Sequence, residues 1–236
     1  MKNYTKENYG KDKNAWLNHR GIGGTSASAI VGLNPYQTKL DIYCAIENPK
    51  EEKDEATGER VDYGRKLEPL IRNNINANFS HKYKVRNPKG FEMYRRKDKP
   101  YMTATLDGTM TSLTDPNEKW VIEIKTHDMG DSEDRAKWEG KEIPQHYLIQ
   151  CLHYLSVLND YKGVLFVAKL RYMNFDTDEP YKEVIMYLKI ERSEYEKEIN
   201  DLETAITNFW ENNVMEHVPP AVKDLSLMNE EEETNE

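Results

Sequence analysis

The stretch KWVIEIKT, residues 119–126, has the alternation of a β-strand but carries an acid and a lysine within it. Successive side chains of a strand point to opposite faces of a sheet. One face therefore carries Trp120, Ile122 and Ile124. The opposite face carries Val121, Glu123 and Lys125. Taken alone, such a charged pair usually marks the solvated side of a sheet, so the rest of the chain decides whether it has a chemical role.

A second alternating segment precedes this strand. YMTATLDGTM, residues 101–110, is separated from it by TSLTDPNE, whose Asp-Pro-Asn is typical of a turn, and we expect a β-hairpin. The hairpin would bring Asp107 beside Glu123 and Lys125. Hard divalent cations such as Mg²⁺ prefer carboxylate oxygens, water and substrate phosphate as ligands, and an adjacent ammonium can orient the attacking water.

The remaining pattern predicts helices on both sides of these strands. Residues 24–46 indicate two short helices separated by a turn at NPY, with Thr38 as an N-cap. Residues 58–79 have helical spacing, with Pro69 beginning or kinking a helical segment. Further along we expect a buried helix in EIPQHYLIQCLHYLSVLN, strands in GVLFVAKL and KEVIMYLKI, and a helix over 193–215. This order predicts an α/β fold, with a central mixed β-sheet flanked by helices.

Composition favours a globular protein of one domain. The 236 residues include 37% hydrophobic and 10% aromatic residues, and we expect one domain over 1–224 and a disordered acidic tail over 225–236. No run of eighteen apolar residues and no signal-peptide pattern is present, which favours a cytoplasmic protein with no membrane partner. Cys44 and Cys151 lie in apolar helical patterns and are expected to be buried thiols.

The net charge of −9 is unfavourable for a protein that binds nucleic acid. Its distribution weakens that objection, because residues 81–100 carry eight lysines and arginines against Glu92 and Asp98, whereas the tail contains four consecutive glutamates. The basic segment is interpreted either as a contact for phosphates or as an ordinary solvated face.

Five stretches together resemble the phage-type alkaline exonucleases and YqaJ-like viral recombinases, a branch of the PD-(D/E)xK (restriction-endonuclease-like) nuclease superfamily that includes the phage lambda exonuclease. They are RGIGGTSASAIVGLNPY, YGRKLEPLI, TATLDG, VIEIKT and IPQHYLIQCLHYL, within residues 20–36 and 61–154. Any one stretch is weakly specific, but their order matches the family. One departure is Leu106, which stands where the family usually has a proline.

The resemblance implies roles for particular residues. Asp107 and Glu123 correspond to metal ligands, the carbonyl of Ile124 to a third ligand, and Lys125 to the lysine beside the nucleophilic water. Glu68 corresponds to an acid near the metal. Its helical spacing with Ile71 and Ile75 also places a carboxylate beside an apolar stripe, where it needs a partner.

Two further groups of residues acquire roles in the same way. Gln150 and Tyr154 form the family's Q-x-x-x-Y element, and Tyr147 shares their helical face. Without the resemblance, both tyrosines would be ordinary core aromatics. In the family an arginine and a hydroxyl contact the 5'-phosphate of DNA, which implies Arg20 and one of Thr25, Ser26 or Ser28. His146 and His153 are interpreted as structural.

The resemblance as a whole implies a Mg²⁺-dependent 5'-to-3' exonuclease acting on double-stranded DNA ends in phage or prophage recombination, with Mn²⁺ able to replace Mg²⁺. It also implies a homotrimeric ring, a single-strand annealing protein as partner, and the cytoplasm of a bacterial host. Two alternatives remain open: an endonuclease with the same core, and a non-catalytic DNA-binding module.

Overall fold

The computed structural model describes residues 2–48, 59–130, 132–173 and 181–221. A five-stranded mixed sheet lies at its centre, in the order β2-β5-β6-β7-β8. Its strands are β2 (Tyr83–Arg86), β5 (Gly108–Ser112), β6 (Lys119–Asp128), β7 (Gly163–Met173) and β8 (Tyr181–Glu191). Strands β6 and β7 are parallel, and the other neighbours are antiparallel. The predicted mixed sheet and the β5–β6 hairpin are confirmed.

A second, three-stranded sheet was not predicted. It has the order β1-β3-β4, with the strands β1 (Tyr4–Asn8), β3 (Glu92–Arg96) and β4 (Thr103–Ala104). Residues 101–110, expected as one strand, are divided between the two sheets, because β4 pairs with β3 whereas β5 pairs with β6. The chain therefore crosses from one sheet to the other just before Asp107, and that residue stands outside both ladders.

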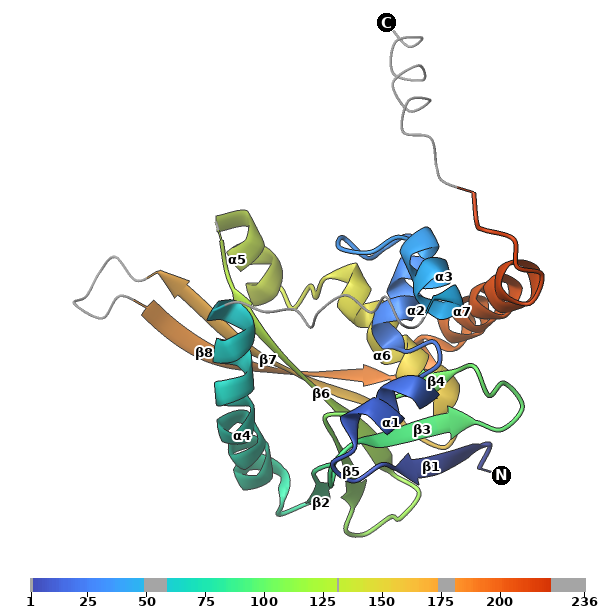
Figure 1. Ribbon diagram of the computed structural model, residues 1–236. Helices are drawn as coiled ribbons and strands as arrows, with labels where there is room; N and C mark the ends of the chain where they lie inside the picture. Colours follow the sequence, from blue (N-terminus) through green and yellow to red (C-terminus); the bar gives the residue numbers. More distant parts are fainter. Residues whose placement is uncertain (1, 49–58, 131, 174–180, 222–236) are drawn as a thin grey trace, which may run out of the picture.

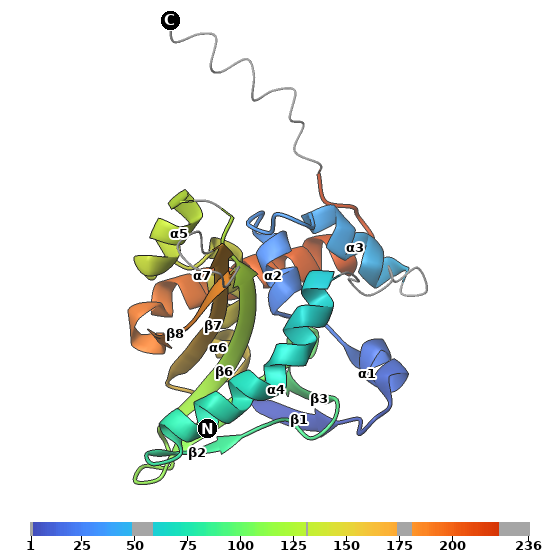
Figure 2. The ribbon, with the colours of Figure 1, turned by 90° about the vertical axis from the view of Figure 1, so that its left-hand side faces the viewer.

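The helices lie on both faces of the main sheet (Figures 1 and 2). Helix α4 crosses one face, while α2, α6 and α7 gather over the other. The bounds are α1 (Lys13–His19), α2 (Gly24–Ile30), α3 (Lys39–Glu47), α4 (Glu59–Phe79), α5 (Ser132–Glu139), α6 (Gln145–Val157) and α7 (Glu196–Phe209). A 3₁₀ turn, η2 (Arg192–Glu194), precedes α7, and a π-helical turn, η3 (Trp210–Val214), follows it.

The two faces of β6 follow the predicted alternation. Trp120 and Ile122 pack with Ile71 and Ile75 of α4. Val121, on the opposite face, belongs to the larger core beneath α2, α6 and α7. The hydrophobic effect therefore fixes which side chains of β6 face which helices, and it places Glu123 and Lys125 on the α6 side.

Details of the helices confirm some predictions and correct others. Thr38 caps α3 in a capping box with Asp41, as expected from its side chain and spacing. Helix α4 runs through Pro69, so this proline does not begin a segment. Cys151 is buried as predicted, but Cys44 is exposed, because it lies on the outer side of α3 while Ile42 and Tyr43 are the buried residues.

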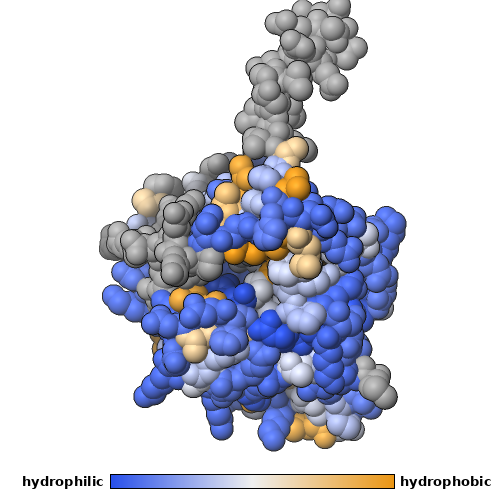
Figure 3. Space-filling view, turned by 45° about the vertical axis from the view of Figure 1, so that its right-hand side comes forward, coloured by the Kyte–Doolittle hydropathy of each residue, from blue (hydrophilic) through white to orange (hydrophobic). Residues whose placement is uncertain are grey.

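The surface and the chain ends add little to the fold. Within the described residues, no helix is long and apolar enough to cross a bilayer. Figure 3 shows a largely hydrophilic face on which apolar residues form small separate groups. The predicted domain end at 224 and acidic tail over 225–236 lie outside the described residues and stay predictions.

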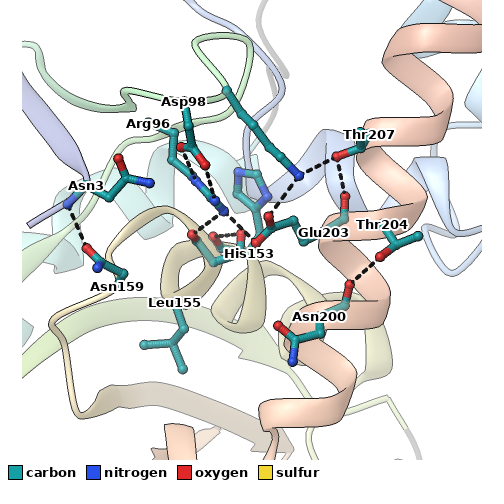
Figure 4. A network of polar contacts seen from close by, with 12 residues as sticks. Asn3, Arg96, Asp98, His153, Leu155, Asn159, Asn200, Glu203, Thr204 and Thr207 are labelled. Carbon is teal, nitrogen blue, oxygen red and sulfur yellow. Dashed lines mark hydrogen bonds and ion pairs between the residues drawn. The ribbon is translucent and has the colours of Figure 1, made fainter. Parts of the chain in front are cut away.

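A network of ion pairs, here called the α7 network, joins α7 to β3 and to the loop that follows β3 (Figure 4). Arg96 bonds Glu203 at 2.5 Å and Asp98 at 2.8 Å, and Lys99 bonds Glu203 at 2.8 Å. Other cations of the basic segment are paired too: Arg86 with Glu92, and Arg95 with Glu7. Four of its eight lysines and arginines therefore stabilise the fold, and they do not form a free phosphate-binding surface.

Candidate active site

The site begins at the place where β5 stops. The β5–β6 ladder ends with Gly108 opposite Ile122, and the chain turns away at Asp107. Beyond that point the Asp107 carboxylate, and not a neighbouring strand, bonds the edge of β6: Oδ2 accepts a 2.7 Å hydrogen bond from the backbone N–H of Ile124. The N–H and C=O of one strand residue leave by the same edge, so the Ile124 carbonyl also faces the Asp107 side.

Glu123 and Lys125 lie beside this edge on the α6 side of β6. Glu123 is 2% exposed, and its Oε1 lies 2.5 Å from Lys125 Nζ. Burial lowers the pKa of Lys125, but the carboxylates of Glu123 and Asp107 outweigh it and the net shift is upward. The hairpin thus brings Asp107, Glu123 and Lys125 together, as the sequence predicted.

The electrostatics of Asp107 are unusual for an aspartate. Burial, the largest contribution, and the neighbouring Glu123 carboxylate raise its pKa from 3.8 to about 7. Lys125 and the Ile124 N–H act in the opposite direction, and Glu68 adds a smaller upward contribution. Two carboxylates this close repel each other unless a proton or a cation lies between them.

Glu68 joins the group from α4 through an arginine that the sequence analysis missed. Arg72, one turn further along α4, donates to the Glu68 carboxylate and to the backbone carbonyl of Asp107. A planar guanidinium can hold two acceptors at once in a fixed geometry. Arg72 therefore fixes Glu68 and the Asp107 backbone relative to each other. We call Glu68, Arg72, Asp107, Glu123 and Lys125 the Asp107 cluster.

Helix α6 covers the buried side of this cluster. Gln150 donates a 2.6 Å hydrogen bond to the hydroxyl of Tyr154, which is 3% exposed. The Glu123 and Asp107 carboxylates are close enough to contribute to the raised pKa of Tyr154, after burial, which is the main cause. Tyr147 lies beneath Lys125, whose Nζ is 5.1 Å from the ring centroid. The predicted face of α6 thus points at the cluster.

A cavity of about 460 Å³ opens at the cluster. It is lined by Tyr36, Tyr63, Gly64, Glu68, Asp107, Ile124, Thr126, His127, Asp128 and Tyr147. Glu123 and Lys125 are not among these lining residues. Gly64 permits a close approach of α4 to β6, because a Cβ at that position would lie 2.9 Å from the Thr126 hydroxyl oxygen.

The residues implied to bind a 5'-phosphate lie in α2 and, for Arg20, at the C-terminal cap of α1, and none of them lines the cavity. Arg20 is exposed, with its guanidinium 4.6 Å over the ring of Trp16. Thr25 is exposed and Ser26 half-buried, whereas Ser28 is buried and donates to the Thr25 carbonyl. Helix α2 packs closely on α6 at Gly24, where a Cβ would lie 2.5 Å from Gln150 Cγ.

His127 and Tyr36 are among the cavity residues that were not identified from the sequence. His127 continues the alternation of Glu123 and Lys125 along β6, and its Nε2 lies 2.8 Å from Asp134 Oδ2. Tyr36 belongs to the NPY turn and is 83% exposed. The periodicity of β6 was a usable signal for His127. The Glu68–Arg72 spacing of four was a usable signal for Arg72.

The donor set suits a hard divalent cation. Within the described ranges, no three His, Cys, Asp or Glu side chains form a complete metal site by themselves. Asp107, Glu123 and the Ile124 carbonyl supply two carboxylates and a neutral oxygen, and magnesium sites commonly take one or two carboxylates and fill the rest with water and substrate phosphate. The raised pKa of Asp107 is consistent with a site that a cation would stabilise.

Comparison with known proteins gives consistent matches. The family model described as "YqaJ-like viral recombinase domain" matches residues 15–161. The uncharacterized protein YqaJ of Bacillus subtilis is 26% identical over 221 residues, which cover 92% of this chain but only 61% of that protein. This chain therefore spans less than two thirds of that relative.

Two solved structures show the same fold. An alkaline exonuclease, LHK-Exo, in complex with dAMP matches with a TM-score of 0.57 and 12% identity, covering 86% of this chain and 91% of that one. The structure of LHK-Exo from Laribacter hongkongensis matches with a TM-score of 0.56 and 11% identity, over 86% and 94%. The predicted PD-(D/E)xK-type α/β fold is confirmed by these neighbours.

Proposed function

Since the chain belongs to the YqaJ-like viral recombinase family, we propose that it is a metal-dependent deoxyribonuclease. The observation that carries the proposal is the meeting of Asp107, Glu123 and Lys125 at the open edge of β6. The structural neighbours add support, because LHK-Exo is described as an alkaline exonuclease.

The more specific proposal is a 5'-to-3' exonuclease that acts on double-stranded DNA ends and leaves 3' single-stranded overhangs. Arg20 with Thr25 or Ser26 would contact the 5'-phosphate, since the Ser28 hydroxyl is buried and bonded to Thr25 and Asn34. The protein would act in phage or prophage recombination within the bacterial cytoplasm, as a homotrimeric ring that passes the 3' strand to a single-strand annealing protein. A ring would also allow a protein of net charge −9 to enclose DNA, if basic groups face its channel.

Each residue of the site has a distinct proposed role. Asp107, Glu123 and the Ile124 carbonyl would hold Mg²⁺, with Mn²⁺ as a substitute, and the bound cation would polarise the scissile phosphate and acidify a water. Lys125 would orient the attacking water and stabilise negative charge on the phosphoryl oxygens. Glu68, held by Arg72, would bind a water at the cavity side of Asp107. Gln150 and Tyr154 would hold the buried side of the cluster in place, with Tyr147 supporting Lys125.

A cleavage assay tests this function and its alternatives. A linear duplex labelled at one 5' end, with or without a 5'-phosphate, and a covalently closed circle are incubated with the protein in Mg²⁺ or EDTA. We expect Mg²⁺-dependent loss of the linear duplex from its 5' ends, faster with the 5'-phosphate. Equal cutting of the closed circle would instead identify an endonuclease, and binding without cutting would identify a DNA-binding module.

Two lysine variants test whether cleavage depends on the Asp107 cluster or on surface lysines in general. Lys125→Ala should abolish cleavage. Lys197→Ala is the matched control, because Lys197 is 85% exposed and pairs only with Asp201 on the outside of α7 among the contacts described. Cleavage by Lys125→Ala at the wild-type rate would contradict the assignment.

A further inference from the structure

Tyr36 is exposed and yet belongs to the cavity. Its side chain is 83% exposed, although it lines the same space as Asp107 and Glu68. A single exposed aromatic side chain is common on protein surfaces, but this ring also lines the cavity at the Asp107 cluster, so it is available to a molecule bound there.

The loop that carries Tyr36 is held in place. The backbone N–H of Tyr36 donates to Asn34 Oδ1 at 2.8 Å, and the Asn34 amide donates to the buried Ser28 hydroxyl at 3.0 Å. The loop is thus anchored to α2. An anchored loop reduces the conformational entropy that would be lost when a ligand packs on the ring.

Behind Tyr36, other aromatic rings lead inward to the cluster. His146 meets Tyr36 edge-on, with ring centroids 6.2 Å apart and an interplanar angle of 89°. Tyr147 follows at 4.1 Å from His146 and lies beneath Lys125. The Nε2 atom of His146 is buried, and it has no hydrogen-bond partner within the described structure. The aromatic rings therefore form a continuous path from Tyr36 to Lys125, whereas His146 itself does not line the cavity.

We propose that Tyr36 stacks on one nucleobase of the DNA strand whose phosphate occupies the Asp107 cluster. This inference rests on the proposed function and deepens it, because it adds a positioning residue for the same substrate. Stacking on an aromatic ring tolerates any base, since every base has a π-face. The contact would therefore hold the strand end without selecting a sequence.

Binding measurements test the stacking directly. Fluorescence anisotropy in EDTA gives the Kd for a blunt duplex labelled at its far end, and for a series in which one terminal nucleobase at a time is removed to leave an abasic residue. We expect Tyr36→Ala to weaken binding of the intact duplex by about 5- to 150-fold. For the wild type, removal of the base at one position should weaken binding by a similar factor. For Tyr36→Ala, removal of the base at that same position should weaken binding little further.

Two further variants show whether the ring itself is responsible. Tyr36→Phe should bind like the wild type, because it keeps the ring and removes only the hydroxyl. Leu113→Ala is the control for removal of an exposed apolar side chain, since Leu113 is 60% exposed and does not line the cavity. If Tyr36→Phe were as weak as Tyr36→Ala, or if every abasic position cost Tyr36→Ala as much as the wild type, the stacking inference would be wrong.

A parallel cleavage assay separates this inference from the function on which it rests. A wild type that cuts DNA while Tyr36→Ala binds and cuts equally well overturns the stacking alone. A wild type that binds DNA through Tyr36 but never cuts it overturns the nuclease function alone. Absence of any duplex binding by the wild type overturns both.

Discussion

The α7 network and the Asp107 cluster are built from similar side chains, but their charges balance differently. The α7 network has two carboxylates, Asp98 and Glu203, and two cations, Arg96 and Lys99. The Asp107 cluster has three carboxylates and two cations, and one carboxylate, Asp107, bonds only the backbone N–H of Ile124 among its described contacts.

The pKa shifts follow from this difference. Arg96 is the main cause that lowers the pKa of Asp98 from 3.8 to about 2. Burial raises the pKa of Glu203, but Arg96 and Lys99 outweigh it, and the net shift is downward. In the Asp107 cluster, burial and Glu123 raise the pKa of Asp107 to about 7. Balanced charges stabilise a fold, whereas an excess of buried carboxylates leaves a position for a cation.

The largest expected effect concerns Asp107→Asn. Loss of a metal ligand should reduce cleavage by at least about 10³-fold, since metal polarisation is worth several kcal/mol in the transition state. Thermal stability should be unchanged or higher, because the neutral amide removes repulsion from Glu123. Cleavage rates, calorimetric Mg²⁺ titration and thermal melts check this. A variant that retains activity would place the metal elsewhere.

Arg72→Lys should have the next largest effect. Lysine keeps the charge but loses the planar fork that bonds both Glu68 and the Asp107 carbonyl, and loss of such supporting contacts typically costs about 10- to 100-fold in activity or metal affinity. The loss of activity is measured as the change in kcat/KM for duplex cleavage. Arg135→Lys is the matched control, because Arg135 pairs with Glu139 at the same helical spacing on an exposed surface. Equal activities of the two variants would exclude a positioning role.

Glu203→Gln should lower stability and leave activity unchanged, which is the reverse of the result expected for Asp107→Asn. It leaves Arg96 and Lys99 without their shared carboxylate, so the free energy of unfolding should fall by about 1–3 kcal/mol. Cleavage per folded molecule should stay at the wild-type level, because the α7 network does not line the cavity. Denaturant titration measures the free energy of unfolding, and a cleavage assay at low temperature measures the activity per folded molecule. Lost activity in a stable variant would mean that the two clusters are coupled.

Asp98→Asn should have the smallest effect, and the effect should depend on pH. The folded-state pKa of Asp98 lies below the ordinary value of 3.8, so its contribution to stability is present above pH 3.8 and is lost as pH falls towards about 2. Asp98 is 45% exposed, so solvent screening keeps the deficit of the variant at pH 7 below about 1 kcal/mol. The difference in melting temperature between the two proteins should therefore be constant from pH 7 to about pH 4 and shrink as pH falls from about 4 towards about 2. A difference that stays the same down to pH 2 would contradict the pairing.

The sequence predicted the parts of the site that depend on local pattern. The alternation of β6 placed Glu123 and Lys125 on one face, and the turn at Asp115, Pro116 and Asn117 brought Asp107 alongside them. The helical spacing of α6 likewise placed Tyr147, Gln150 and Tyr154 on one face. These predictions succeeded because side-chain direction follows from backbone geometry alone.

Features that depend on distant partners were not predictable in this way. The alternation of residues 101–110 is continuous, and it contains no signal that β4 and β5 pair in different sheets. Strand β1 has a single buried residue, Tyr4, and so has almost no apolar period. The bond from Arg72 to the Asp107 carbonyl joins residues 35 apart, and it depends on where α4 packs.

The crossing of the chain between the two sheets has a practical consequence for producing the protein. Asp107 is the third residue after β4, β4 pairs with β3, and β3 pairs with β1. Tyr4 is 4% exposed and its hydroxyl donates to Asp160, so β1 is held in place by packing as well as by its pairing with β3. Preparations from which proteases have removed β1 should therefore be checked for activity as well as for solubility.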